Sequence, residues 1–240
     1  MRQIPRLFVS ERLEQGAEFP LEDGQAHYLA SVLRLDVGAE LRLLDDATGE
    51  WAALVSEAGR RRIRVRVGAM IRGRETVGDL WLLTAPIRAE RFEWIVEKAT
   101  ELGVRRIVPV LSERVNHARL KPERLRAHMV EAAEQCGRTA LPELAEAVKL
   151  GDVLRGWDPG RALLFADEAG GAAMGELGVS LPAAILIGPE GGFSDAERAA
   201  ILAVAGVKRL SLGPRILRAD TAVVAAIAQF QGFAQKLSAA

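Results

Sequence analysis

Two loops that combine glycine and proline follow apolar segments in the last quarter of the sequence. The first reads AILIGPEGGFS from Ala184, and the second reads LSLGPRILRADTA from Leu210. In each loop the glycine can turn freely and let a ligand approach, while the proline fixes the following bend. Ser194 and Glu197 have the spacing of a capping box, which predicts a helix directly after the first loop. A strand, a glycine-containing loop and a helix are the elements with which α/β enzymes hold a ligand.

The first loop differs from the known phosphate-binding loops. It lacks the GxGxxG order of a dinucleotide site and the GK[ST] ending of a P-loop, and Glu190 lies where a phosphate would bind. An NAD-dependent enzyme is therefore disfavoured. Because neighbouring strands of a parallel sheet end at the same edge, we expect the two loops to face each other at that edge, where α/β folds place ligands.

Apolar and amphipathic segments alternate through residues 73–240, which is typical of a parallel sheet with crossover helices. The strand-like segments are DLWLLTAPI, RRIVPVLS, RALLFADE, AAILIGPE and VKRLSLG. The predicted helices are ERFEWIVEKATELGV, residues 122–137, SDAERAAILAVAG and TAVVAAIAQFQGFAQKL. Glu97, Lys98 and Glu101 have the spacing of an ion-paired, solvated helix face. This part of the chain is predicted to be an α/β domain.

Residues 1–72 contain short segments with strand character, AELRLLD, EWAALVSEA and RIRVRVGAMI, separated by turns that contain glycine and aspartate. Arg62, Arg64 and Arg66 alternate with aliphatic residues, so a strand here places all three on one face. From Arg60 through Arg74 the sequence has arginines and no acid. A solvated sheet face and a phosphate-binding strip are both compatible with this pattern.

Composition excludes several classes of protein. The 240 residues include 32 Lys and Arg and 32 Asp and Glu, so no global field marks a nucleic-acid or membrane binder. Cys136 is the only cysteine, which rules out an internal disulfide and a cysteine-built zinc site. We expect no metal requirement. The sequence shows neither a signal peptide nor a stretch of about 20 apolar residues, so we expect a soluble cytoplasmic protein.

The motifs EWIVEKATELGV, EAAEQCGR, IGPEGGFS and LSLGPRILRADTA, in this order, resemble the ribosomal RNA small subunit methyltransferase E family. The resemblance extends to His27, Arg34 and Gly38 and covers essentially the whole chain. It implies an S-adenosylmethionine-dependent enzyme that methylates N3 of a uridine in 16S ribosomal RNA. It also implies a small PUA-like β-barrel that binds RNA over residues 1–72. Residues 73–240 would form a methyltransferase domain of the SPOUT class with a C-terminal trefoil knot, acting as a homodimer on the 30S subunit.

The resemblance also implies a set of site residues. Glycine loops suit S-adenosylmethionine, which has no phosphate to bind, because backbone groups can contact its adenine and ribose. The implied cofactor residues are Thr84, Ile187, Gly188, Pro189, Glu190, Gly191, Leu212, Gly213, Ile216, Leu217, Thr221 and Ala222. The expected RNA-binding residues are Arg6, Arg34 and Arg138, together with Arg62, Arg64 and Arg66 of the arginine pattern described above. The chain departs from the family at Ala219 and Asp220, where Thr-Glu is usual, and Asp220 or Thr221 can cap the helix instead.

Methylation of a uracil nitrogen requires the N3 proton to leave and the resulting charge to be stabilised. Arg218 can donate two hydrogen bonds to a developing oxyanion. Glu190 can accept the proton or orient the loop backbone, and the sequence does not separate these two roles. Two other functions stay open at this point: a SPOUT methyltransferase acting on transfer RNA or on a ribose 2′-hydroxyl, and a non-catalytic RNA-binding protein.

The last predicted helix is apolar nearly all round, from Val223 to Phe230. Such a helix must be buried on more than one side. We therefore expect it to pack near the two-fold axis of a homodimer.

Overall fold

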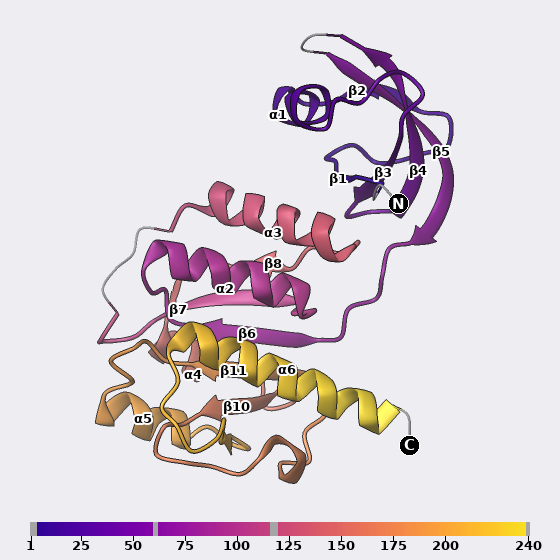
Figure 1. Cartoon of the computed structure of the whole chain (residues 1–240). Coiled ribbons are helices and arrows are strands. Elements are labelled where there is room, and N and C mark those ends of the chain that lie inside the picture. Colours follow the sequence, from indigo (N-terminus) through magenta and orange to yellow (C-terminus); the bar gives the residue numbers. More distant parts are fainter. Residues whose placement is uncertain (1–3, 60–61, 116–119, 239–240) are drawn as a thin grey trace. The chain divides into compact units, whose positions relative to one another are not determined.

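The computed structural model describes residues 4–59, 62–115 and 120–238 (Figure 1). The chain forms two compact units. Residues 1–76 and 130–141 make up the first unit, and residues 77–129 and 142–240 make up the second. The division of the chain between residues 72 and 73, expected from sequence, stays a prediction.

The first unit contains a five-stranded sheet in the order β1-β3-β4-β5-β2. Its strands are β1 (Arg6–Phe8), β2 (Glu18–Pro20), β3 (Glu40–Asp45), β4 (Gly49–Ala58) and β5 (Ile63–Gly73). β1 runs parallel to β3, and the other pairs are antiparallel. The helix α1 (Asp23–His27) continues into a π-helical turn, η1 (Tyr28–Val32).

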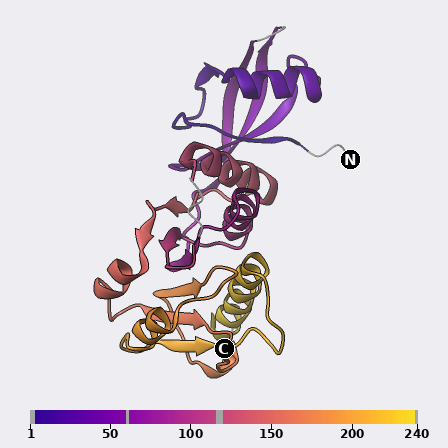
Figure 2. The ribbon, with the colours of Figure 1, turned by 90° about the vertical axis from the view of Figure 1, so that its left-hand side faces the viewer.

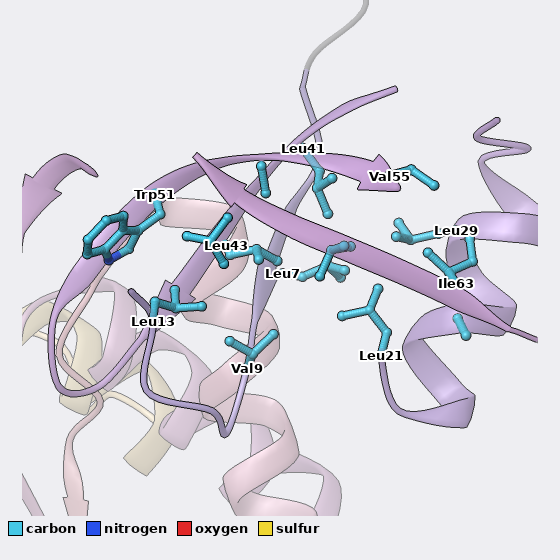
Figure 3. Close-up of a cluster of buried hydrophobic side chains, with 14 residues drawn as sticks. Leu7, Val9, Leu13, Leu21, Leu29, Leu41, Leu43, Trp51, Val55 and Ile63 are labelled. Atoms are coloured by element: carbon cyan, nitrogen blue, oxygen red, sulfur yellow. The ribbon is translucent and has the colours of Figure 1, made fainter. Parts of the chain in front are cut away.

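One face of this sheet carries the core of the first unit. Ile63, Val65 and Val67 of β5 are buried, whereas Arg64 is half-buried and Arg66 is exposed, as the predicted alternation requires. Figure 3 shows Leu29, from η1, next to Ile63 in the same apolar cluster. The short helical segment therefore closes the apolar side of the sheet and leaves the arginine side open.

The second unit is built on a parallel sheet in the order β12-β10-β11-β6-β7-β8, with β9 also paired to β7. The strands are β6 (Leu80–Thr84), β7 (Arg106–Leu111), β8 (Glu143–Leu144), β9 (Val148–Lys149), β10 (Ala162–Ala166), β11 (Ala183–Ile187) and β12 (Lys208–Leu210). Every residue of β11 is buried, as expected for an interior parallel strand. The predicted parallel α/β sheet is confirmed.

Helices cover both faces of this sheet. They are α2 (Ala89–Glu101), α4 (Leu150–Arg155), η2 (Met174–Glu176, a 3-10 turn), α5 (Asp195–Leu202) and α6 (Ala219–Ser238). A further helix, α3 (Pro122–Cys136), begins in the second unit and ends in the first. α2 packs against α6, and α4 packs against α5. Figure 2 shows α5 and α6 on opposite sides of the strands. The second unit is therefore a three-layer α/β structure.

The sequence explains where these helices begin and which side they bury. In α2, Phe92, Ile95, Val96 and Ala99 recur at helical spacing and are all buried. At the start of α5, the Ser194 hydroxyl accepts a hydrogen bond from the backbone of Glu197, and the Glu197 carboxylate accepts one from the backbone of Ser194. The predicted capping box is confirmed, and it fixes the point at which the preceding loop ends.

Candidate functional site

A cavity with a volume of about 190 Å³ lies at the carboxyl ends of three parallel strands, β10, β11 and β12. Its walls come from residues 165–168, 170, 187–190, 192–193 and 210–217, from Arg198 of α5 and from the first turn of α6. β10 lies between β11 and β12, so the two glycine loops do not follow adjacent strands, contrary to the sequence expectation. They meet around this cavity nonetheless, because parallel strands end at one edge of the sheet.

The first loop, residues 188–193, is held between its strand and the capped helix. The backbone N–H of Gly192 donates to the carbonyl of Pro189 at 2.9 Å, and Gly192 has a φ of +65°, which favours glycine. Phe193 packs edge-on against Phe165 of β10, with ring centroids 5.7 Å apart. These contacts fix the loop that carries Glu190.

The second loop, residues 211–218, presents an unusual apolar side chain. Ile216 lines the cavity with 85% of its surface exposed. Gly213 has a φ of +113°, and a Cβ added there would meet no protein atom within 4 Å. At the end of the loop, the Asp220 carboxylate accepts from the backbone N–H of Thr221 at 2.7 Å and pairs with Arg91 of α2. Asp220 thus satisfies a free donor in the first turn of α6.

A third loop, after β10, completes the cavity, and the sequence reasoning did not identify it. The Asp167 carboxylate is buried and accepts from Arg198 of α5 at 2.7 Å, from Arg209 of β12 at 2.8 Å and from the backbone of Ala169 at 3.0 Å. Burial alone would raise its pKa, but the hydrogen bonds from these arginines and the backbone hold the pKa of Asp167 below its ordinary value. The adjacent acids in RALLFADE, at a strand end, were the signal available in the sequence.

Most of the predicted cofactor residues line this cavity. They are Ile187, Gly188, Pro189, Glu190, Leu212, Gly213, Ile216, Leu217 and Ala222. Thr84, Gly191 and Thr221 are not among its lining residues. Thr84 ends β6 and is fully buried, and its hydroxyl has no hydrogen-bond partner among the described residues. Thr221 is exposed in the first turn of α6.

A second cavity adjoins the first, because Pro189 and Glu190 line both. It is bordered by the loop after β6, the start of α2, the loop after β7 and Arg218. The two predicted catalytic residues, Glu190 and Arg218, therefore belong to the same cavity wall. Gly191, predicted as a cofactor residue, lines this second cavity.

The predicted RNA-binding arginines of the first unit differ in their surroundings. Arg34 is exposed with a φ of 53°, and Arg62 is exposed next to β5. Arg6 pairs with the buried carboxylate of Glu50 at 3.0 Å. Arg138 is only 5% exposed and its guanidinium donates to the carbonyl of Ala140, so its burial does not favour direct contact with RNA.

The arginine strip on β5 is partly neutralised, which the sequence interpretation did not anticipate. Glu18 of β2 lies opposite Arg66 in the antiparallel pair. Its carboxylate lies 3.2 Å from Arg66 and 3.7 Å from Arg64. Hydrogen bonds from Ser56 and Arg66 lower the pKa of Glu18, so it is ionised at neutral pH. The sequence between Arg60 and Arg74 contains no acidic residue, but the neighbouring strand β2 supplies one, Glu18.

The helix face that contains Glu97, Lys98 and Glu101 is ion-paired, as predicted. Lys98 lies 2.6 Å from Glu97 and 2.7 Å from Glu101, and these hydrogen bonds raise the pKa of Lys98. Within the described residues, no three acidic, histidine or cysteine side chains are grouped so that they could hold a metal ion. None of the described helices combines the length and the apolar character needed to cross a membrane.

Comparison with known proteins relates most of the chain to RNA methyltransferases. Residues 74–231 match a family described as "RNA methyltransferase domain", and residues 21–68 match "RNA methyltransferase PUA domain". The chain is 31% identical to "Ribosomal RNA small subunit methyltransferase E" of Rickettsia conorii, over 93% of each chain. It is 33% identical to the protein of that name from Synechocystis, over 93% of this chain and 76% of that one.

Two solved structures resemble the fold closely. A Ribosomal RNA small subunit methyltransferase E from Neisseria gonorrhoeae, bound to S-adenosylmethionine, superposes with a TM-score of 0.85 and 26% identity, over 97% of this chain and 98% of that chain. A protein from Legionella pneumophila, in complex with the same cofactor, gives a TM-score of 0.85 and 28% identity, over 96% and 98% of the two chains.

Proposed function

The chain belongs to the ribosomal RNA small subunit methyltransferase E family, and from this membership we propose that it methylates N3 of a specific uridine in 16S ribosomal RNA, with S-adenosylmethionine as the methyl donor. The observation that carries the proposal is the cavity at the ends of β10, β11 and β12, where most of the implied cofactor residues meet. Cytoplasmic location accords with a ribosomal substrate.

The residues around this cavity suit S-adenosylmethionine. Gly213 leaves room for a ligand against the backbone, and the exposed side chain of Ile216 offers an apolar surface for an adenine ring. Glu168 and Glu190 place carboxylates at a cavity that would receive a cationic sulfonium and ammonium. When bound, the cofactor supplies a methyl group on a positively charged sulfur.

The transfer requires the chain to manage one proton and one developing negative charge. Arg218 directly precedes α6 and lines the second cavity, where it can donate hydrogen bonds to a uracil carbonyl oxygen as N3 loses its proton. Glu190, which lines both cavities, can accept that proton or hold the loop backbone in place. Because Arg218 favours the anionic form of the base, it makes N3 a better nucleophile.

Four features of the family extend the proposal. They are the C-terminal trefoil knot, the closure of the first sheet into a PUA-like barrel, the division of the chain into a 1–72 RNA-binding domain and a 73–240 methyltransferase domain, and the homodimer. α6 supports the last of these. Its inner side is fully buried, whereas Val224, Ala225, Ala228 and Phe233 are half-buried or exposed. A second copy of the chain would cover this apolar outer side.

The proposal is tested in two steps. Calorimetry with S-adenosylmethionine separates a methyltransferase from a non-catalytic RNA-binding protein, because only the methyltransferase needs the cofactor. Transfer of a labelled methyl group is then compared between naked 16S RNA, assembled 30S subunits and transfer RNA. Cofactor binding with transfer to 16S RNA or to 30S subunits supports the proposal. Transfer to transfer RNA alone, or no cofactor binding by the folded protein, contradicts it.

A further inference from the structure

The second cavity is strongly basic. Its volume is about 720 Å³, which lies within the range of about 300–1,000 Å³ typical of ligand pockets. Among the described residues, four arginines line it, Arg88, Arg91, Arg114 and Arg218, against one lining carboxylate, Glu190. All of these residues belong to the second unit. A cavity with this balance of charge attracts an anion.

The four arginines differ in how far their guanidinium groups are already paired with protein groups. Arg91 pairs with Asp220 at 2.5 Å, so its charge is largely compensated. Arg114 donates one hydrogen bond, from Nη1 to the carbonyl of Gly191 at 2.8 Å, which leaves the rest of its five N–H donors for a ligand. Arg88 precedes α2 and is exposed. Arg88 and Arg114 are therefore the guanidiniums available to a bound anion, next to Arg218.

The position of Arg114 links this cavity to the reaction. Its hydrogen bond to Gly191 ties the loop after β7 to the loop that contains Glu190. Because Glu190 and Pro189 line both cavities, a ligand in the basic cavity reaches the cofactor cavity across these two residues. The anionic group of a methyl acceptor bound here would therefore lie next to the cofactor cavity.

We propose that this cavity binds the RNA backbone at the target nucleotide, with Arg88 and Arg114 on the phosphates that flank it and the base turned toward Glu190 and Arg218. A guanidinium fork matches the geometry of phosphate oxygens, and the phosphodiester is the anion that every nucleotide of the substrate carries. Arg91 acts as a positioning residue, because its pair with Asp220 holds the start of α6, directly after Arg218. This inference rests on the proposed function.

The test is steady-state methyl transfer to 30S subunits that lack the methyl group, measured at several KCl concentrations. For Arg114→Gln we expect KM for the subunits to rise about tenfold, since the variant loses a charge-assisted hydrogen bond to a phosphate. The slope of log KM against log[KCl] should fall by about 0.7, the value for one phosphate contact to single-stranded nucleic acid. Cofactor affinity by calorimetry should stay unchanged in Arg88→Gln, because Arg88 lines only the second cavity.

Three further variants make the test specific. Arg114→Lys keeps the charge and should retain the salt slope while losing the fork geometry. Arg88→Gln changes an exposed side chain and should reproduce the effect in a fully folded protein. Arg155→Gln is the matched control, because Arg155 is an exposed arginine of α4 that lines neither of these two cavities.

The outcomes are distinct. A raised KM and a lower slope for Arg114→Gln and Arg88→Gln, with the Arg155→Gln values equal to the parent's, support the proposal. Values for both cavity variants equal to those of Arg155→Gln overturn it. A parent enzyme that binds no S-adenosylmethionine, or that transfers no methyl group to either 30S subunits or 16S RNA, would instead contradict the proposed function.

Discussion

Replacing Asp167 with Asn should lower the stability of the second unit and weaken cofactor binding. The carboxylate joins three segments around the cofactor cavity: the loop after β10, α5 through Arg198 and β12 through Arg209. Its side chain is 1% exposed, whereas those of Arg198 and Arg209 are 36% and 41% exposed. Asn has the same shape but no charge, so the substitution removes both ion pairs and leaves the packing in place.

The structure sets the size of the effect. Breaking a buried ion pair costs about 3–5 kcal/mol when the remaining charge stays buried. Here the two arginines reach solvent, so their charges are hydrated after the substitution, and we expect a smaller loss of about 2 kcal/mol. In a chain of this size that loss corresponds to a Tm lower by about 4–8 °C. Affinity for S-adenosylmethionine should also fall, because the loop after β10 lines the cavity.

The assay is thermal and urea unfolding of the two proteins beside a matched control. Asp152→Asn removes the carboxylate of an exposed pair with Arg155, where the two side chains are 47% and 75% exposed. An exposed pair contributes about 0–1 kcal/mol, so this control should unfold close to the parent. Equal losses for Asp167→Asn and Asp152→Asn, or an unchanged Tm for both, would refute the reasoning from burial.

The pH dependence of the Asp167 contribution has a defined direction. Its pKa in the folded protein lies below its ordinary value of about 3.9. The stabilisation is therefore complete at pH values above about 4 and is lost as the pH falls through the folded pKa. The difference in stability between the parent and Asp167→Asn should stay constant from pH 5 to 8 and shrink in stronger acid.

Three further predictions concern the cofactor, the RNA and the dimer. Gly213→Val should reduce affinity for S-adenosylmethionine at least tenfold in calorimetry, because it strains a backbone at φ +113° and places a side chain in the cavity; unchanged affinity in a folded variant would contradict this. Replacing Arg62, Arg64 and Arg66 with Ala should weaken RNA binding and reduce the slope of log affinity against log[salt] by at most about 2. The reduction is limited because one carboxylate, that of Glu18, already compensates two of the three charges. Equal slopes for the variant and the parent would indicate that these arginines form only a solvated sheet face. Ala228→Glu should give a monomer in sedimentation, because it places a charge on the outer side of α6, and a stable dimer would place the interface elsewhere.

The choice of Ala228 follows from a difference between sequence and structure. The apolar sequence of α6 suggests Ile227 as a position at which to disrupt a dimer. Ile227 is fully buried within its own subunit, so a charge there would unfold the chain and would not report on association. Composition identifies a helix with two apolar sides, but only the packing of α6 in the second unit determines which side faces inward.

Local patterns predicted the elements well, because their causes are local. The capping box at Ser194, the alternation in β5 and the apolar stripe of α2 each depend on residues a few positions apart. Contacts between distant segments were not predictable. The pairing of Glu18 with Arg66 depends on the register of β2 against β5, and the Asp167 network depends on β10 lying between β11 and β12. No pattern within a single segment encodes either arrangement.

Nucleoside mass spectrometry of the reacted 16S RNA tests the central claim most directly. Subunits from cells that lack this methyl group are incubated with the protein and S-adenosylmethionine, and the RNA is digested to nucleosides and to sequenced fragments. The account predicts 3-methyluridine at a single position, formed by the parent and lost in Arg218→Ala. A methyl group on a ribose, on another base or at many positions would contradict it.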